Sequence, residues 1–211
     1  MKPRKLVCWG LFVLHLTGMN EMGETWLRNF LADPQLHQLL ERVDADLAEE
    51  ARREGCCCGG KLHRADYERK ARGVSQWNKR YSFCCDQEDC RRRRTPESVR
   101  FLGRKVYAGL IVVLISAMMH GLKPERVRRI REVLKISPST LKRWRQWWLD
   151  NFVRSSFWKA MRARFMPVLC EETLPWSLWM RFEIDERDRL LAVLQFLRPI
   201  TTAATWKEQA M

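Results

Sequence analysis

Six of the eight cysteines fall into two short clusters, the pattern in this sequence that most directly suggests chemistry. Cys56 and Cys58 form a Cys-x-Cys pair followed by two glycines, and Cys84 or Cys85 pairs with Cys90 across a short loop. A structural zinc ion needs four ligands in a tetrahedron at about 2.3 Å, and glycine turns let thiolates and backbone N–H groups converge on it. The sequence predicts a zinc ribbon with Zn2+ as cofactor and leaves open whether Cys84 or Cys85 is the ligand.

Two other interpretations of the cysteines stay open. They would pair as disulfides in an oxidising compartment, or remain unligated thiols in a reducing one. His63 could replace one cysteine, although a lone histidine five residues after Cys58 is more typical of a polar surface residue. Cys8 and Cys170 lie outside both clusters, so we expect neither to bind the metal.

Charge indicates an acidic partner. The net charge is +14, and residues 61–150 hold 23 Lys and Arg against 9 Asp and Glu, which accounts for the whole surplus. Such a surplus is typical of proteins that bind nucleic acid or an anionic membrane surface. At 211 residues and 46% hydrophobic content, the chain is long enough for one folded domain or two small ones.

The segment LKPERVRRIREVLKISPSTLKRWRQWWLDNF predicts two helices joined by a tight turn. Pro124 opens the first helix; Ser137 is a good N-cap for the second, with Pro138 at its first position. Apolar residues of the second helix form one stripe: Leu141, Trp144, Trp148 and Phe152. This is the pattern of a helix-turn-helix, and a soluble helical hairpin is its alternative.

Candidate DNA contacts fall into two groups. We expect phosphate contacts from the run after the second cysteine cluster and from the first helix: Arg91, Arg92, Arg93, Arg94, Arg128 and Arg131. We expect the polar face of the second helix to face the groove: Ser139, Lys142, Arg143 and Gln146. Arg143 could hold a guanine and Gln146 an adenine, whereas a solvated charge run is the alternative for the arginines.

The amino terminus MKPRKLVCWGLFVLHLTGM has a basic start and an apolar stretch of signal-peptide length, without a convincing cleavage site. Residues 1–22 are therefore either a signal-like segment or a wrongly assigned start before Met22. In the first case the protein would be secreted and its cysteines would form disulfides. In the second it would be cytoplasmic and associated with the nucleoid.

The remaining segments predict helices. Residues 23–55 contain apolar residues at helical spacing, and Asp33 with Pro34 marks a helix start. The apolar stretch Val106 to Leu122 is short and impure for a membrane span, so we expect a buried helix and no membrane partner. The tail, residues 153–211, predicts helices with packed aromatic residues: Phe157, Trp158, Trp176 and Trp179.

We therefore expect a mainly α protein with a small β zinc ribbon at 56–94, an apolar helix plus helix-turn-helix at 95–152, and a helical tail.

Several tracts resemble a group of short bacterial proteins associated with transposases and insertion sequences: CGGKLHRADYERKARG, SFCC, CRRRRTPESVRFLGRKVY and SPSTLKRWRQWW. The resemblance covers roughly residues 24 to 202. It implies the zinc-ribbon and helix-turn-helix front end of a transposase, with double-stranded DNA as partner and a transposase or a second copy as a further one.

A catalytic domain is not expected. RNase-H-like transposases need three spaced carboxylates that hold two metal ions, and about 60 residues follow the second helix. The acidic residues there alternate with Arg187 and Arg189, which favours a solvated helical face. We therefore expect a non-catalytic DNA-binding protein, with a transposase subunit that acts beside a catalytic partner, or a disulfide-bonded secreted or membrane protein, as alternatives.

Overall fold

The computed structural model describes residues 24–70, 72, 78–103, 105, 107–119, 124–182 and 185–202. The expectations about residues 1–22 lie outside these residues. The fold is mainly helical with a small antiparallel sheet, as the sequence predicts. Two compact units make up the chain: an aromatic unit (Met1–Ala32 and Val113–Arg181) and a ribbon unit (Asp33–Val112 and Phe182–Met211).

The ribbon unit begins with its longest helix, α3 (Pro34–Glu54). As predicted, Asp33 is the N-cap: its carboxylate accepts the backbone N–H of Gln35 at 2.9 Å, and Pro34 occupies the first turn. The helix ends at Gly55, whose φ of 71° suits glycine. Its buried stripe runs at four-residue spacing through Leu36, Leu40, Asp44 and Ala48, and so includes a carboxylate.

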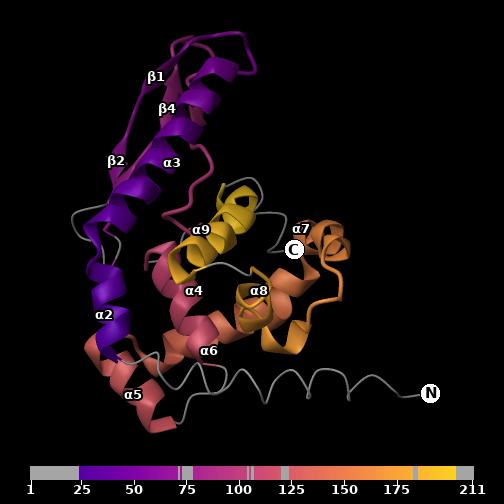
Figure 1. Cartoon of the computed structure of the whole chain (residues 1–211). Coiled ribbons are helices and arrows are strands. Elements are labelled where there is room, and N and C mark those ends of the chain that lie inside the picture. Colours follow the sequence, from indigo (N-terminus) through magenta and orange to yellow (C-terminus); the bar gives the residue numbers. More distant parts are fainter. Residues whose placement is uncertain are drawn as a thin grey trace. The chain divides into compact units, whose positions relative to one another are not determined.

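A long β-hairpin follows α3 and lies beside it (Figure 1). Its two segments are β1 (Leu62–Arg64) with β4 (Phe83–Cys85), and β2 (Tyr67–Glu68) with β3 (Lys79–Arg80). The third strand, β5 (Arg93–Arg94), pairs with β4, so the sheet order is β1-β4-β5. These strands lie within residues 56–94, where the sequence predicts a small β module.

The inner face of this sheet packs on α3 and forms a small core. Its buried members are Ala48, Leu62, Tyr81, Phe83 and Cys85, with Ala45, Cys56 and Cys90 packed against them. Small residues on α3 let the sheet approach the helix closely. Because three of these members are cysteines of the two clusters, the candidate metal site and the core share side chains.

A buried carboxylate ties three parts of the ribbon unit together. Asp44, 1% exposed, accepts hydrogen bonds from Ser98 Oγ at 2.6 Å, the Val99 N–H at 2.7 Å and Arg100 Nε at 2.8 Å. Ser98 N–H in turn donates to Thr201 Oγ1 at 3.0 Å. The network therefore joins α3, the segment that follows β5, and the carboxyl-terminal turn of the unit.

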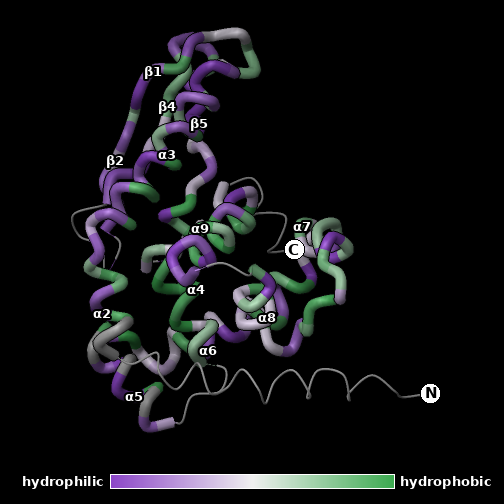
Figure 2. The backbone as a smooth tube through the Cα atoms, viewed as in Figure 1, coloured by the Kyte–Doolittle hydropathy of each residue, from purple (hydrophilic) through white to green (hydrophobic). Residues whose placement is uncertain are grey.

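The ribbon unit is completed by α9 (Glu186–Leu197) and the short η4 (Arg198–Thr201). The apolar helix α4 (Gly109–Met118) starts in this unit and ends in the aromatic unit. Every residue of α4 is buried, and Figure 2 shows it as one of the most hydrophobic stretches of the chain. Among the helices of the described residues, none combines the length and apolar character needed to cross a membrane.

The aromatic unit contains the two helices joined by a turn: α5 (Pro124–Val133) and α6 (Pro138–Gln146). The Ile136 N–H bonds to Arg131 O at 2.9 Å and the Lys135 N–H to Glu132 O at 3.2 Å, with Lys135 at a φ of 50°. This is a Schellman end, which stops α5 sharply. Ser137 then caps α6 by accepting the Thr140 N–H, as predicted.

Beyond Gln146 the helix continues as a π-helical turn, η1 (Trp147–Phe152). The predicted stripe is buried, and Trp147 joins it at 4.7 Å from the Trp148 ring. Phe152 lies 5.1 Å from both Trp148 and Trp158. The other elements of the unit are short: α2 (Glu24–Ala32), α7 (Ser156–Met161), η2 (Arg162–Arg164), η3 (Glu171–Thr173) and α8 (Trp176–Trp179).

We predict that Asp44→Ala strongly destabilises the protein, because it leaves the Arg100 guanidinium, 3% exposed, buried without its main acceptor. Breaking a buried ion pair from one side costs about 3–5 kcal/mol. The control is Asp46→Ala, an exposed carboxylate on the same helix. Urea titrations of both variants measure the free energy of unfolding, and equal midpoints would contradict this role for Asp44.

Candidate functional site

Four cysteine sulfurs converge at one end of the ribbon. The Sγ atoms of Cys56 and Cys90 lie 3.6 Å apart, and those of Cys58 and Cys85 lie 3.4 Å apart. All four ligand atoms lie within 4.8 Å of one another, so the group could hold a metal ion. The sequence prediction is therefore confirmed to the extent that these four cysteines come together.

The first turn needs its glycines. Cys56 N–H donates to Gly60 O at 3.1 Å and Gly59 N–H to Cys56 O at 2.8 Å, with Gly59 at a φ of 84°. A Cβ on Gly60 would lie 2.6 Å from Cys85 Sγ and 2.8 Å from Asp86 Oδ1. Only a glycine at position 60 therefore lets the two cysteine turns close on each other.

The second turn is fixed by backbone bonds. Cys90 N–H and Arg91 N–H both donate to Gln87 O, at 3.1 and 2.9 Å. Asp86 Oδ1 accepts the Lys61 N–H at 2.9 Å and thereby links this turn to the first strand. The four sulfurs are thus positioned by the backbone of two turns rather than by side-chain packing alone.

The four thiols differ in acidity. The backbone N–H of Cys58 stabilises the Cys56 thiolate and lowers the pKa of Cys56 to about 6, whereas burial raises the pKa of Cys85 to about 12. At neutral pH these groups would not all be ionised by themselves. A cation that replaces the thiol protons would remove this difference, because metal binding deprotonates its cysteine ligands.

The structure selects Cys85 over Cys84. Phe83 and Cys85 point to the inner face of β4, whereas Cys84 Sγ lies 3.5 Å from Arg91 O, apart from the four sulfurs. Cys57 is also outside the group, and its sulfur accepts Arg92 Nη1 at 2.6 Å. His63 does not join it either, with 69% of its side chain exposed and Nε2 3.9 Å from Asp86.

The four consecutive arginines all make contacts within the ribbon. Arg93 donates to Ala65 O at 3.0 Å, and Arg94 donates to Gly55 O at 2.8 Å and also pairs with Glu54. Arg91 lies 4.0 Å from Glu88, and Arg92 contacts Cys57. Their role in phosphate binding stays a prediction.

The predicted polar face of α6 is exposed at each of its four residues: Ser139, Lys142, Arg143 and Gln146. Arg143 Nη2 donates to Thr140 Oγ1 at 3.1 Å, and Gln146 Nε2 donates to Asp150. Arg145 is also exposed on this helix, although the predicted DNA contacts do not include it; its place off the apolar stripe of Leu141, Trp144 and Trp148 is the sequence signal for its exposure. On α5, Arg128 and Arg131 lie 4.0 and 3.7 Å from Glu132.

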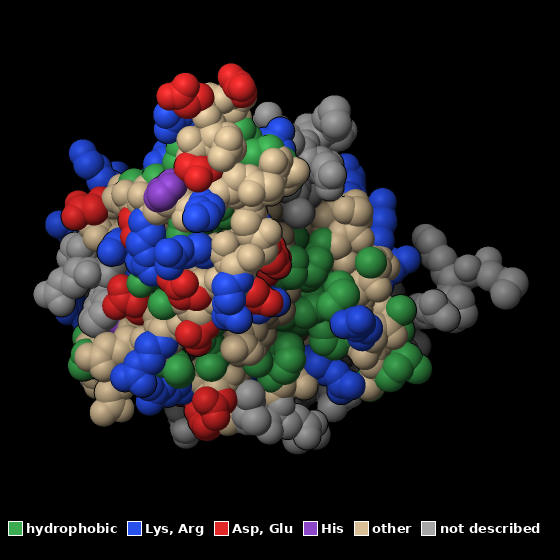
Figure 3. Space-filling view, turned by 90° about the horizontal axis from the view of Figure 1, so that it is seen from above, with side chains coloured by type: hydrophobic (Ala, Val, Ile, Leu, Met, Phe, Trp, Pro, Cys, Tyr) green, Lys and Arg blue, Asp and Glu red, His purple; other side chains and the backbone are tan. Residues whose placement is uncertain are grey.

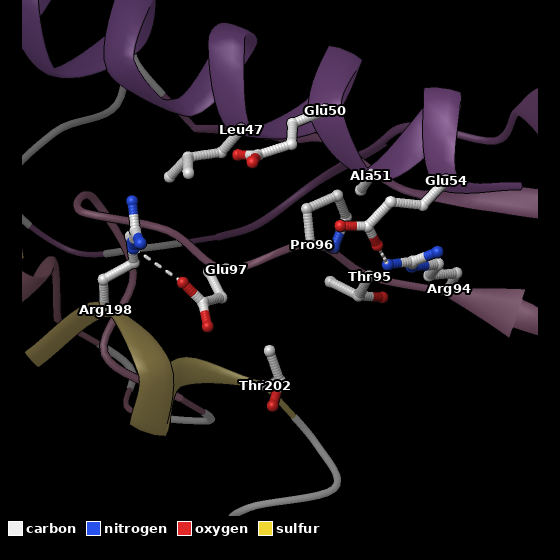
Figure 4. Close-up of a pocket in the computed structure, with 10 residues that line it drawn as sticks. All are labelled: Leu47, Glu50, Ala51, Glu54, Arg94, Thr95, Pro96, Glu97, Arg198 and Thr202. Carbon is white, nitrogen blue, oxygen red and sulfur yellow. Dashed lines mark hydrogen bonds and ion pairs between the residues drawn. The ribbon is translucent and has the colours of Figure 1, made fainter.

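A cavity of about 340 Å³ lies in the ribbon unit between α3, the segment after β5, and η4. Figure 4 shows two ion pairs among the side chains that line it, Arg94 with Glu54, and Arg198 with Glu97 at 2.6 Å. A ligand would have to break these pairs, so the cavity is a weaker candidate site than the four cysteines. On the face shown in Figure 3, basic and acidic side chains likewise lie interspersed.

Comparison of the chain with models of known protein families, with curated proteins and with solved structures finds no match.

We predict that Cys85→Ser abolishes stoichiometric metal binding, whereas the neighbouring Cys84→Ser retains it, because only Cys85 Sγ lies among the four sulfurs. Cys58→Ser and Cys57→Ser form a second matched pair in the first turn, with loss expected only for Cys58. Mass spectrometry of the metal content, with titration of free thiols, measures both pairs. Retention of one equivalent of metal in Cys85→Ser would remove that residue from the site.

Proposed function

We propose that this chain is a non-catalytic, zinc-stabilised DNA-binding protein related to transposases of mobile elements, and that α5 and α6 act as a helix-turn-helix. The observation that carries the proposal is the division of α6 into two faces. Leu141 and Trp144 are buried, whereas the opposite face presents cations and hydrogen-bonding groups to solvent. A second helix with this division, after a sharp turn, is what major-groove binding requires.

Zinc is the ion that best fits the four sulfurs. In a regular tetrahedron with bonds of about 2.3 Å, neighbouring sulfurs lie about 3.8 Å apart. The Sγ–Sγ distances of 3.4 Å (Cys58 to Cys85) and 3.6 Å (Cys56 to Cys90) lie close to this value, and all four sulfurs lie within 4.8 Å of one another. Soft thiolate ligands in a tetrahedral set favour zinc over the hard cations calcium and magnesium.

The zinc would act structurally. The sheet and its two cysteine turns share a small cluster of five buried residues, so a bound metal would add to the stability of this part of the unit. Four protein ligands fill a tetrahedral site and leave no position for a reacting water. We therefore assign the metal to folding and not to catalysis.

Two side chains of α6 are suited to reading bases. A guanidinium can bond guanine O6 and N7 together, and a carboxamide can bond adenine N6 and N7 together. Arg143 and Gln146 carry these groups, and each is held by a neighbour one turn away, Thr140 and Asp150 respectively. The bond to Asp150 uses one N–H of Gln146 and leaves its other N–H and its oxygen available for adenine.

The remaining cations would neutralise phosphates. On α6 these are Lys142 and Arg145, and no acidic residue occurs from Pro138 to Leu149. The arginines Arg91, Arg92, Arg93, Arg94, Arg128 and Arg131 would add to them despite their internal contacts. The relation to transposases depends on the sequence resemblance, and a transposase or a second copy of the chain remains the proposed protein partner in the cytoplasm.

We predict that Arg143→Ala mainly removes the preference for DNA sequences that the wild type selects. The difference in binding free energy between the preferred and a mismatched site should fall by about 1–3 kcal/mol. Each phosphate contact should contribute about 0.9 to the slope of log affinity against log salt. Arg164→Ala is the matched control, since Arg164 is an exposed arginine of the same unit outside α6. Fluorescence anisotropy with selected and scrambled duplexes at several salt concentrations separates the two effects.

Two results would contradict the proposal. Wild-type binding that does not change with salt would exclude DNA as a partner, because phosphate neutralisation releases counterions. Full sequence preference in the double variant Arg143→Ala and Gln146→Ala would exclude α6 as the reading helix. Strand transfer by the chain together with an added transposase would favour the alternative of a transposase subunit.

A further inference from the structure

Tyr67 on β2 carries an exposed aromatic ring. Its residue is 39% exposed, whereas all the other aromatic side chains whose burial is described lie buried or half-buried. The side chain is also outside the core that packs on α3. Exposure of this ring is therefore not explained by packing within the ribbon.

Arg93 lies against this ring. Its guanidinium is 5.2 Å from the centre of the Tyr67 ring, a cation–π distance, and its Nη2 donates to Ala65 O at 3.0 Å. Arg93 pairs with Cys84, which pairs with His63, and these three residues alternate with the inward-facing Leu62, Phe83 and Cys85. Arg93 therefore reaches across the outer face of the sheet to Tyr67, and the carbonyl bond holds it there.

The surroundings combine cations with one partly buried acid. Asp66, with 14% of its side chain exposed, lies 3.4 Å from Lys79 Nζ and 3.6 Å from Arg64 Nη1. Arg64 also pairs with Glu49 on α3, and Glu68 is exposed beside Tyr67. Lys79 keeps 53% of its side chain exposed, but it pairs with Glu68 in the strand register and its Nζ lies 5.7 Å from the centre of the Tyr81 ring. Arg93 is therefore the cation that the structure places against the Tyr67 ring.

We propose that Tyr67 and Arg93 form a stacking site for an unpaired base of DNA. The inference rests on the proposed DNA-binding function and narrows the partner to DNA that carries a single-stranded segment next to a duplex. Exposed aromatic rings and guanidinium planes stack on bases of any sequence, because every base has a π-face. A fixed guanidinium beside the ring also reduces the entropy lost when a base is bound.

The test compares two probes with the full zinc-loaded chain: a blunt duplex, and the same duplex with a short single-stranded extension. Wild type should bind the extended probe about tenfold more tightly, as expected for one stacked base. Tyr67→Ala should lose this preference and keep its affinity for the blunt duplex. Tyr67→Phe, which keeps the ring, should retain the preference, and Arg93→Lys, which keeps the charge without the planar group, should weaken it.

A photo-crosslink gives a second, direct measurement. An iodouracil in the extension should crosslink to Tyr67 in the wild type, and mass spectrometry identifies the residue. Equal melting temperatures of Tyr67→Ala and wild type would show that the fold is retained, and crosslinking by Tyr67→Phe tests the site should the alanine variant fold poorly.

The outcomes separate this inference from the proposed function. Binding of the blunt duplex without preference for the extension would overturn the stacking site and leave the function standing. Equal loss on both probes in a folded Tyr67→Ala, or a crosslink elsewhere than the Tyr67–Arg93 pair, would also overturn it. Binding of the extended probe without any binding of the blunt duplex would support the stacking site and overturn duplex reading by α6. Binding of neither probe would overturn both proposals.

Discussion

The ribbon unit depends on one buried charge, the carboxylate of Asp44. Burying a carboxylate is costly unless it is paired and fully hydrogen-bonded, and Asp44 receives three donors, one of them the guanidinium of Arg100. Those donors come from consecutive residues, so the chain between β5 and α4 is held against α3 over three residues. A hydrophobic contact could hold the same segment, but it would not fix which residue faces the helix, whereas this set of directional bonds does.

The four-cysteine turns depend in turn on the sheet that α3 supports. Cys85 is a core residue and a member of the sulfur group, and Cys56 and Cys90 pack against the same core. Metal binding at these sulfurs and packing of this core would therefore depend on each other. Loss of the metal would leave ionisable thiols at the edge of a small core. The arrangement of the two turns requires glycine at position 60, because any side chain there would push the turns apart.

The sequence predicts the starts of α3 and α6 correctly because both depend on local chemistry, a capping side chain followed by proline. It also identifies Cys56, Cys58 and Cys90 as candidate metal ligands, but it does not decide whether Cys84 or Cys85 is the fourth. Strand alternation contained the answer: Phe83 faces the core, so Cys85 must share its face and Cys84 must not. The role of Asp44 could not be predicted, because its three donors lie more than fifty residues away in the sequence. The burial of Trp147 was missed for a different reason, since the π-helical turn changes the helical period on which the stripe was based.

Charge counting along the sequence overstates the number of arginines that are available to a partner. Arg69, Arg80 and Arg100 each donate to backbone carbonyls, and Arg80 and Arg100 are buried. Burial lowers the pKa of Arg80, yet an arginine keeps its proton in proteins, so the charge remains. A carbonyl satisfies a guanidinium without neutralising it, and the field of these residues extends beyond their contacts. The excess charge of the middle segment would therefore attract a polyanion over a distance. In the proposed DNA complex, direct contacts would fall to the fewer cations that face solvent, those of α6 among them.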